Sequence, residues 1–202
     1  MTMDPILYQE PLGKAADTSA AYLDEVRRAY RAHKRMAEAA MAQVADDKFF
    51  TLLDDESNSL ALLVKHIAGN LRSRFTDFGT SDGEKPDRQR DSEFVILEGD
   101  SRESLMQRWE ASWTLLFNVI AELKPADLAR TVTIRNEPHT ILQALNRSLN
   151  HMVYHIGQIT FLAKHLRSAE WQTLSIPRGK TEEFNAKLAA KFQATSETSN
   201  NQ

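Results

Sequence analysis

The chain reads His151-Met152-Val153-Tyr154-His155-Ile156-Gly157-Gln158 within a long helical pattern that begins after Pro138 and extends to about Leu166. Residues four apart on a helix lie about 40° apart around its axis and about 6 Å apart along it, so both imidazoles can reach one ion. Gln158 continues the same stripe. The apolar side chains fall on the side of the two histidines, which predicts that both face a helical core. These apolar residues include Ile141, Ala144, Met152, Ile159, Leu162 and Leu166.

Three further helical patterns precede this one. The first starts behind the cap candidate Asp17 or Thr18 and runs to about Ala45. The second covers residues 57–79, and the third runs from the cap candidate Ser101 to residue 123, where Pro125 prevents continuation. Strand signals are scarce, although residues 131–135 alternate and predict one short strand or an extended arm. The pattern therefore predicts an all-α four-helix bundle.

The connection between the second and third helices is long. Residues 79–94 are rich in Gly, Pro and charged side chains, and loops of this length are uncommon without a function. Fully extended, the connection spans on the order of 60 Å, enough to cross the bundle end to end. We therefore expect a crossover bundle in which these two helices are parallel.

The C-terminal part carries a shorter helical pattern. Residues 171–180 precede Phe184, Leu188 and Phe192, and we expect this tail to pack on the bundle. The polar end, residues 196–202, is expected to be disordered. Residues 1–195 are thus predicted to form a single domain.

Composition narrows the class of protein. The 202 residues include no cysteine, which excludes disulfides and thiolate chemistry and fits a cytoplasmic location. The chain has 25 basic and 28 acidic residues, a net charge of -3, and no basic stripe, so nucleic acid is not an expected partner. No apolar run is long enough to span a membrane or to serve as a signal peptide. A small molecule is the expected partner.

A third histidine, His66, lies at the edge of the apolar arc of the helix over residues 57–79, with Asn70 one turn further on. Together with His151 and His155 it provides three nitrogen ligands and leaves one coordination position open, an arrangement more often catalytic than structural. Two other interpretations remain: the rings make ordinary core hydrogen bonds, or the ion is purely structural. A spacing of four between two histidines is common on its own.

Other enzyme classes fit the spacing poorly. Met152 stands where a zinc-protease helix carries Glu, and no histidine has Glu three residues before it, as a di-iron bundle requires. Residues 79–83 match the nucleophile-elbow pattern, but a helix precedes them and a polar loop follows, so we reject that interpretation.

The histidines and the bundle pattern resemble the DinB/YfiT-like superfamily of metal-binding four-helix bundles. Within it, the loop segments Thr80–Pro86 and Arg90–Phe94 and the tail Leu174–Gly179 resemble a bacterial branch of unassigned function. The resemblance implies a crossover bundle, often a homodimer, with a divalent ion on His66, His151 and His155. Relatives include S-transferases that use bacillithiol, mycothiol or glutathione, a thiol-dependent isomerase, and members with no demonstrated reaction.

We therefore expect a metal-dependent thiol S-transferase or hydrolase that acts on a small molecule. Zn is the favoured ion, with Ni, Fe or Mn as alternatives, and a low-molecular-weight thiol is a candidate cofactor. Gln158 and Asn70 are candidates for orienting the ligands or a bound water, with plain helix-to-helix hydrogen bonds as the alternative. The alternative is a non-catalytic, stress-associated bundle with a structural ion. Four charged residues are candidates for the mouth of the pocket, unless they form a solvated loop that pairs its own charges: Arg88, Arg90, Asp91 and Arg178.

Overall fold

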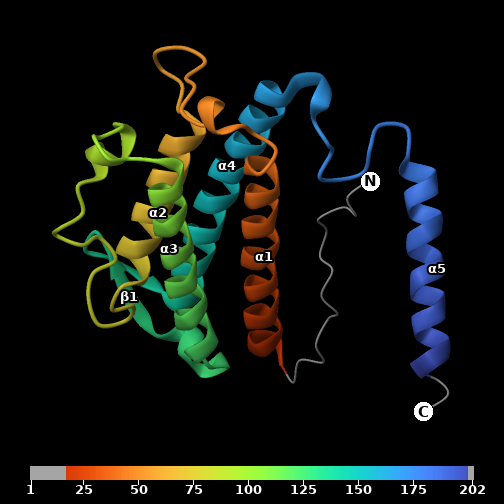
Figure 1. Cartoon of the computed structure of the whole chain (residues 1–202). Coiled ribbons are helices and arrows are strands. Elements are labelled where there is room, and N and C mark those ends of the chain that lie inside the picture. Colours follow the sequence, from red (N-terminus) through yellow and green to blue (C-terminus); the bar gives the residue numbers. More distant parts are fainter. Residues whose placement is uncertain (1–16, 200–202) are drawn as a thin grey trace.

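The structure, a computed structural model, describes residues 17–199. Four helices form the bundle: α1 (Thr18–Met41), α2 (Leu60–Phe75), α3 (Arg102–Glu122) and α4 (Ile141–Arg167). In Figure 1, α1 and α4 run in one direction, whereas α2 and α3 both run in the other. The parallel α2–α3 pair confirms the expected crossover bundle.

Sequence signals at the helix starts correspond to real caps. The side chain of Asp17 accepts a hydrogen bond from the backbone N–H of Ala20, and Ser101 and Ser104 form a reciprocal capping box. The end of α1 was predicted less well, since it ends at Met41 rather than Ala45, whereas α2 ends at Phe75, before Gly79 as expected. Thr76 adopts an extended backbone conformation there, which stops α2.

The core lies between the four helices, and α2 is its most buried element: every residue from Leu60 to Ala68 is inaccessible to solvent or nearly so. Trp109 and Trp113 of α3 are completely buried against it. Tyr30 links α1 to α4, because its buried hydroxyl donates a 3.0 Å hydrogen bond to the carbonyl of Leu145.

Residues 131–140 form a β-hairpin rather than one strand or an arm. Strand β1 (Thr131–Ile134) pairs antiparallel with β2 (Glu137–Thr140), which contains Pro138, so α4 begins three residues later than Pro138. Arg135 and Asn136 at the turn have φ angles of 56° and 62°, as a type I′ hairpin turn requires.

The α2–α3 connection is anchored on this hairpin. The carboxylate of Asp82 accepts hydrogen bonds from the backbone N–H groups of Arg135 and Asn136, each at 2.8 Å. The N–H of Gly83 donates to the carbonyl of Thr133 at 2.8 Å. The connection then forms a short 3₁₀ segment, η2 (Arg90–Phe94), that packs against α2. The loop is thus held in place along its path.

The tail differs from the expectation. Trp171 and Leu174 pack against the core, but α5 (Thr181–Ser199) stands apart from the bundle in Figure 1, and Leu188 is exposed. The predicted packing therefore holds only for the segment before α5. α5 also includes residues 196–199, which were expected to be disordered; residues 1–16 and 200–202 lie outside the described range.

Candidate metal centre

The three predicted histidines converge. His151 and His155 project from neighbouring turns of α4, and His66 projects from α2 on the opposite side of the space between the helices. The Nε2 atom of His151 lies 3.2 Å from the Nε2 of His66 and 3.2 Å from that of His155. His66 and His155 are buried, and His151 is half-buried. Within residues 17–199, these three histidines form the group of His or acidic residues whose ligand atoms lie close enough together to hold an ion. No carboxylate among these residues joins them as a fourth ligand.

The spacing fits a single metal ion. Two nitrogens 3.2 Å apart, each about 2.05 Å from zinc, subtend an angle of roughly 100° at the metal. This angle is close to tetrahedral for both pairs, and all three ligand atoms lie within 4.8 Å of one another, so the set can hold one ion with a further position for another ligand.

Hydrogen bonds orient two of the rings. The Nδ1 of His66 lies 2.8 Å from a carboxylate oxygen of Glu93, and the Nδ1 of His155 lies 2.8 Å from the side-chain oxygen of Gln158. Both acceptors require a proton on Nδ1, which leaves the lone pair on each Nε2. Those two lone pairs point toward the Nε2 of His151. A proton on the Nε2 of His151 can satisfy only one of these two contacts, whereas an ion can bind all three nitrogens.

The environment keeps His151 neutral. Burial, reinforced by the nearby His155 and His66, lowers the pKa of His151 to about 3. Burial also lowers the pKa of His155, despite the hydrogen bond to Gln158. The buried Nδ1 of His151 has no hydrogen-bond partner among the described residues. Neutral imidazole is the form that binds metal, so the donor set fits a divalent ion.

Glu93 was not singled out from the sequence, although it contacts one of the three histidines directly. Its buried carboxylate accepts from His66 and also receives two hydrogen bonds from Arg88, at 2.9 and 3.0 Å. Burial alone raises the pKa of Glu93, but the bonds from His66 and Arg88 outweigh it and lower the pKa overall. Glu93 is therefore an anion that orients His66.

A helical glycine makes room for this carboxylate. A Cβ atom at Gly69 would lie 2.2 Å from the Oε1 atom of Glu93 and 2.7 Å from its Cδ. Such contacts are impossible without moving the carboxylate. A glycine inside a helix, three residues from His66, was the one sequence signal that indicated a close approach here.

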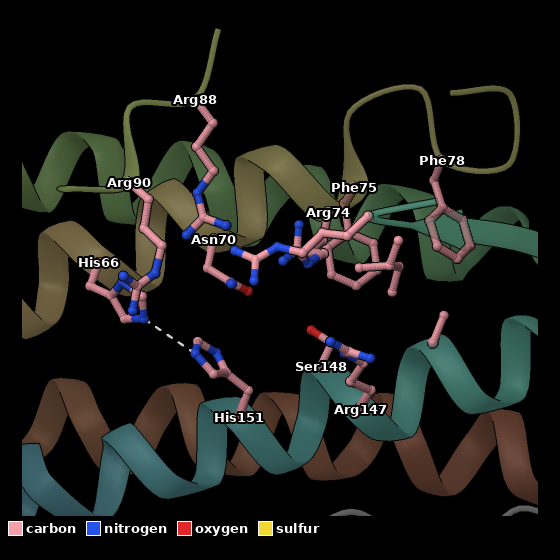
Figure 2. A pocket seen from close by; sticks show the side chains of 13 residues that line it. His66, Asn70, Arg74, Phe75, Phe78, Arg88, Arg90, Arg147, Ser148 and His151 are labelled. Atoms are coloured by element: carbon pink, nitrogen blue, oxygen red, sulfur yellow. Dashed lines mark hydrogen bonds between the residues drawn. The ribbon is translucent and has the colours of Figure 1, made fainter. Parts of the chain in front are cut away.

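A pocket of about 240 Å³ opens beside His66 and His151 (Figure 2). Asn70 lines it, as do Arg88 and Arg90. Four further lining residues were not predicted from the sequence, because they come from three separate elements, α2, the hairpin and α4: Arg74, Arg135, Arg147 and Ser148. Five arginines and no acidic side chain therefore line the wall.

Of the remaining predicted site residues, some lie at the histidines or the pocket and others lie outside it. Gln158 contacts His155, as expected for a residue that orients a ligand, whereas no hydrogen bond joins Asn70 to a histidine. Arg88 and Arg90 are pocket residues, but Asp91 is fully exposed and Arg178 lies in the exposed segment before α5; neither lines the pocket. Asp91 turns outward because consecutive residues of η2 cannot share one face.

Comparison with known proteins agrees with this architecture. A family described as "Protein of unknown function (DUF1572)" matches residues 17–180. The chain belongs to this family. A DinB-like protein, YjoA from Bacillus subtilis, has a crystal structure that superimposes with a TM-score of 0.56 at 15% identity, covering 75% of this chain and 97% of that one. No curated protein matches. The chain is thus a DUF1572 member with an all-α fold similar to that of this DinB-like protein, and its three histidines could hold a metal ion. Over the described residues, none of its helices is long and apolar enough to cross a membrane.

Proposed function

We propose that this protein is a metal-dependent enzyme that acts on a small molecule at a divalent ion held by His66, His151 and His155. The observation that carries the proposal is the convergence of three imidazoles: the Nε2 atom of His151 lies 3.2 Å from that of His66 and 3.2 Å from that of His155, and Glu93 and Gln158 orient the other two rings. Zinc fits the all-nitrogen donor set, and Ni, Fe or Mn can use the same ligands.

The reaction we propose is thiol S-transfer or hydrolysis. A divalent ion supplies Lewis acidity, which activates a thiol or a water molecule for nucleophilic attack near neutral pH. Three protein ligands and a pocket beside two of them favour catalysis over a structural role, because structural sites are usually closed by a fourth protein ligand. A low-molecular-weight thiol and a homodimer belong to the same proposal and follow from the family resemblance. A cytoplasmic location also belongs to it and rests on the absence of cysteine.

Metal analysis of purified protein tests the site. The wild type is expected to carry one ion per chain, and His151→Ala is expected to lose it. His165→Ala is the matched control, because His165 lies on the same helix and is exposed. Equal metal content in wild type and His151→Ala would show that the histidines are not ligands.

Activity assays separate the two roles of the ion. Metal-loaded protein is incubated with bacillithiol, mycothiol or glutathione and a chromogenic electrophile, and separately with activated esters. Turnover that disappears in His151→Ala supports catalysis. A bound ion whose removal lowers the melting temperature, with no turnover of any substrate, favours the structural alternative.

A further inference from the structure

The pocket beside the histidines has an excess of positive charge. The side chains of Arg74, Arg88, Arg90 and Arg147 reach into the space between α2 and α4 in Figure 2, and Arg135 joins them from the hairpin turn. The acidic partners of these arginines lie outside the lining of the pocket. A concave wall of one charge sign raises the local concentration of ligands of the opposite sign.

The carboxylates behind the wall do not neutralise it. Glu84 is shared by three guanidinium groups, at 2.8 Å from Arg74, 3.4 Å from Arg88 and 3.1 Å from Arg135. Glu93 is divided between Arg88 and His66. Three arginines therefore share two carboxylates, one of which also serves a histidine. The crowding is strong enough that burial, together with the neighbouring arginines, lowers the pKa of Arg74 despite its bond to Glu84.

Arg90 and Arg147 are the arginines available to a ligand. Arg90 approaches Asp91 only at 3.8 Å, and that aspartate is fully exposed. Arg147 pairs with Glu137 at 3.2 Å, and both side chains are about half exposed. Exposed pairs of this kind contribute little free energy, so an anion in the pocket can displace them. By contrast, Arg74 and Arg88 are largely buried and maintain the loop.

The side-chain amide of Asn70 is a further polar group in the pocket wall. Asn70 is only 7% exposed and lines the pocket, yet its side-chain amide makes no hydrogen bond to another described residue. The amide lies in the wall of the pocket, so a ligand there can donate a hydrogen bond to it or accept one from it.

From these observations we propose that the pocket binds a small organic anion between the arginines that line it, with Arg90 beside His66 at one side of the pocket and Arg147 at the other (Figure 2). The volume of about 240 Å³ is below the range of drug-sized pockets, which begins at about 300 Å³, and this limits the ligand to a small metabolite. The identification of this anion as the substrate or thiol cofactor rests on the proposed function; the anion subsite itself does not.

The test is titration calorimetry with malonate and with inorganic phosphate at low ionic strength, where charge interactions are least screened. Malonamide, an uncharged analogue of malonate, is the ligand control. The proteins are wild type, the double variant Arg90→Gln/Arg147→Gln, and Arg178→Gln, which removes one charge from an exposed site outside the pocket. Each is measured metal-free and zinc-loaded. Malonate and phosphate distinguish carboxylate from phosphate ligands.

We expect at least one anion to bind metal-free wild type and Arg178→Gln equally, and to bind the double variant about 10-fold more weakly or worse. Malonamide is expected not to bind, and zinc affinity is expected to be the same in all three proteins. Equal anion binding by wild type and the double variant would overturn the subsite, as would an equal loss in Arg178→Gln or the absence of any anion binding.

Two outcomes separate this inference from the proposed function. Anion binding that requires zinc and survives in the double variant places the anion on the metal, which overturns the arginine subsite and supports the metal site. Arginine-dependent anion binding in a wild-type protein that takes up no metal supports the subsite and contradicts the metal-dependent function. Both substituted arginines are about half exposed, so the double variant is expected to fold, and its melting curve checks this.

Discussion

Gly69 and Gly157 both lie inside helices, and we expect replacement by alanine to have opposite effects on stability at the two positions. Gly157 in α4 has open space around its Cβ direction, with no atom within 4 Å. Replacing a glycine by alanine in a helix interior stabilises the helix by about 0.5–1 kcal/mol, so Gly157→Ala is expected to raise the melting temperature by about 1–4 °C. Gly69→Ala gains the same helix propensity but meets the carboxylate of Glu93 at 2.2 Å.

The magnitude at Gly69 follows from the hydrogen bonds that are lost. To restore an ordinary contact of 3.4 Å, the Glu93 oxygen must move by more than 1 Å from its position 2.2 Å from the new Cβ. That oxygen, Oε1, accepts the 2.9 Å bond from Arg88 Nε, which the displacement breaks. Because the carboxylate moves as a rigid group, Oε2 shifts with it, which weakens the 2.8 Å bond from His66 and the 3.0 Å bond from Arg88. A hydrogen bond to a charged group contributes about 1.5–3 kcal/mol, which exceeds the gain in helix propensity. We therefore expect Gly69→Ala to be less stable than wild type by about 1–2 kcal/mol.

The metal affinity of Gly69→Ala should fall more clearly than its stability. Loss of a partner that orients a ligating histidine typically reduces metal affinity by about 10- to 100-fold. The assay is zinc titration of chelator-treated protein beside urea unfolding, with Gly157→Ala as the matched substitution. If Gly69→Ala melts as high as Gly157→Ala and binds zinc with wild-type affinity, Glu93 does not hold His66, and the reasoning is refuted.

Two further predictions concern pH and packing. The pKa of His151 is about 3 in the folded protein against 6.5 in the unfolded chain, so below pH 6.5 the unfolded state binds more protons. The melting temperature of chelator-treated protein should therefore fall as the pH drops from 7 to 5, and it should fall less steeply in His151→Ala. Parallel melting curves for the two proteins would contradict a neutral, buried His151 ring. Tyr30→Phe removes the buried hydroxyl that donates to the Leu145 carbonyl and should lower the free energy of unfolding in urea by about 1–2 kcal/mol. Tyr22→Phe, whose hydroxyl bonds less buried groups, should change it less, and equal losses would show that burial does not set the size of the effect.

Local sequence determined what could be predicted. The helical period was sufficient to place His151 and His155 on one inward face, because a four-residue spacing has a fixed geometry. The caps at Asp17 and Ser101 were predictable for the same reason, since a capping side chain acts within three residues. His66 required a second assumption, the arrangement of the bundle. Glu93 and Arg147 could not be found in this way, because contacts between a loop, a hairpin and two helices leave no periodic signal.

The crossover topology itself explains how the charged groups reach the site. Because α2 and α3 are parallel, the chain must return along the length of α2, which is about 24 Å for its 16 residues, before α3 can begin. A simple up-down bundle would need only a short turn at the end of α2 and would have no segment beside His66. The returning loop passes the hairpin, where Asp82 is anchored, and then packs on α2. There Glu93 contacts His66 and accepts hydrogen bonds from Arg88. The long connection is therefore part of the candidate metal centre, and shortening it should impair metal binding even if the four helices still assemble.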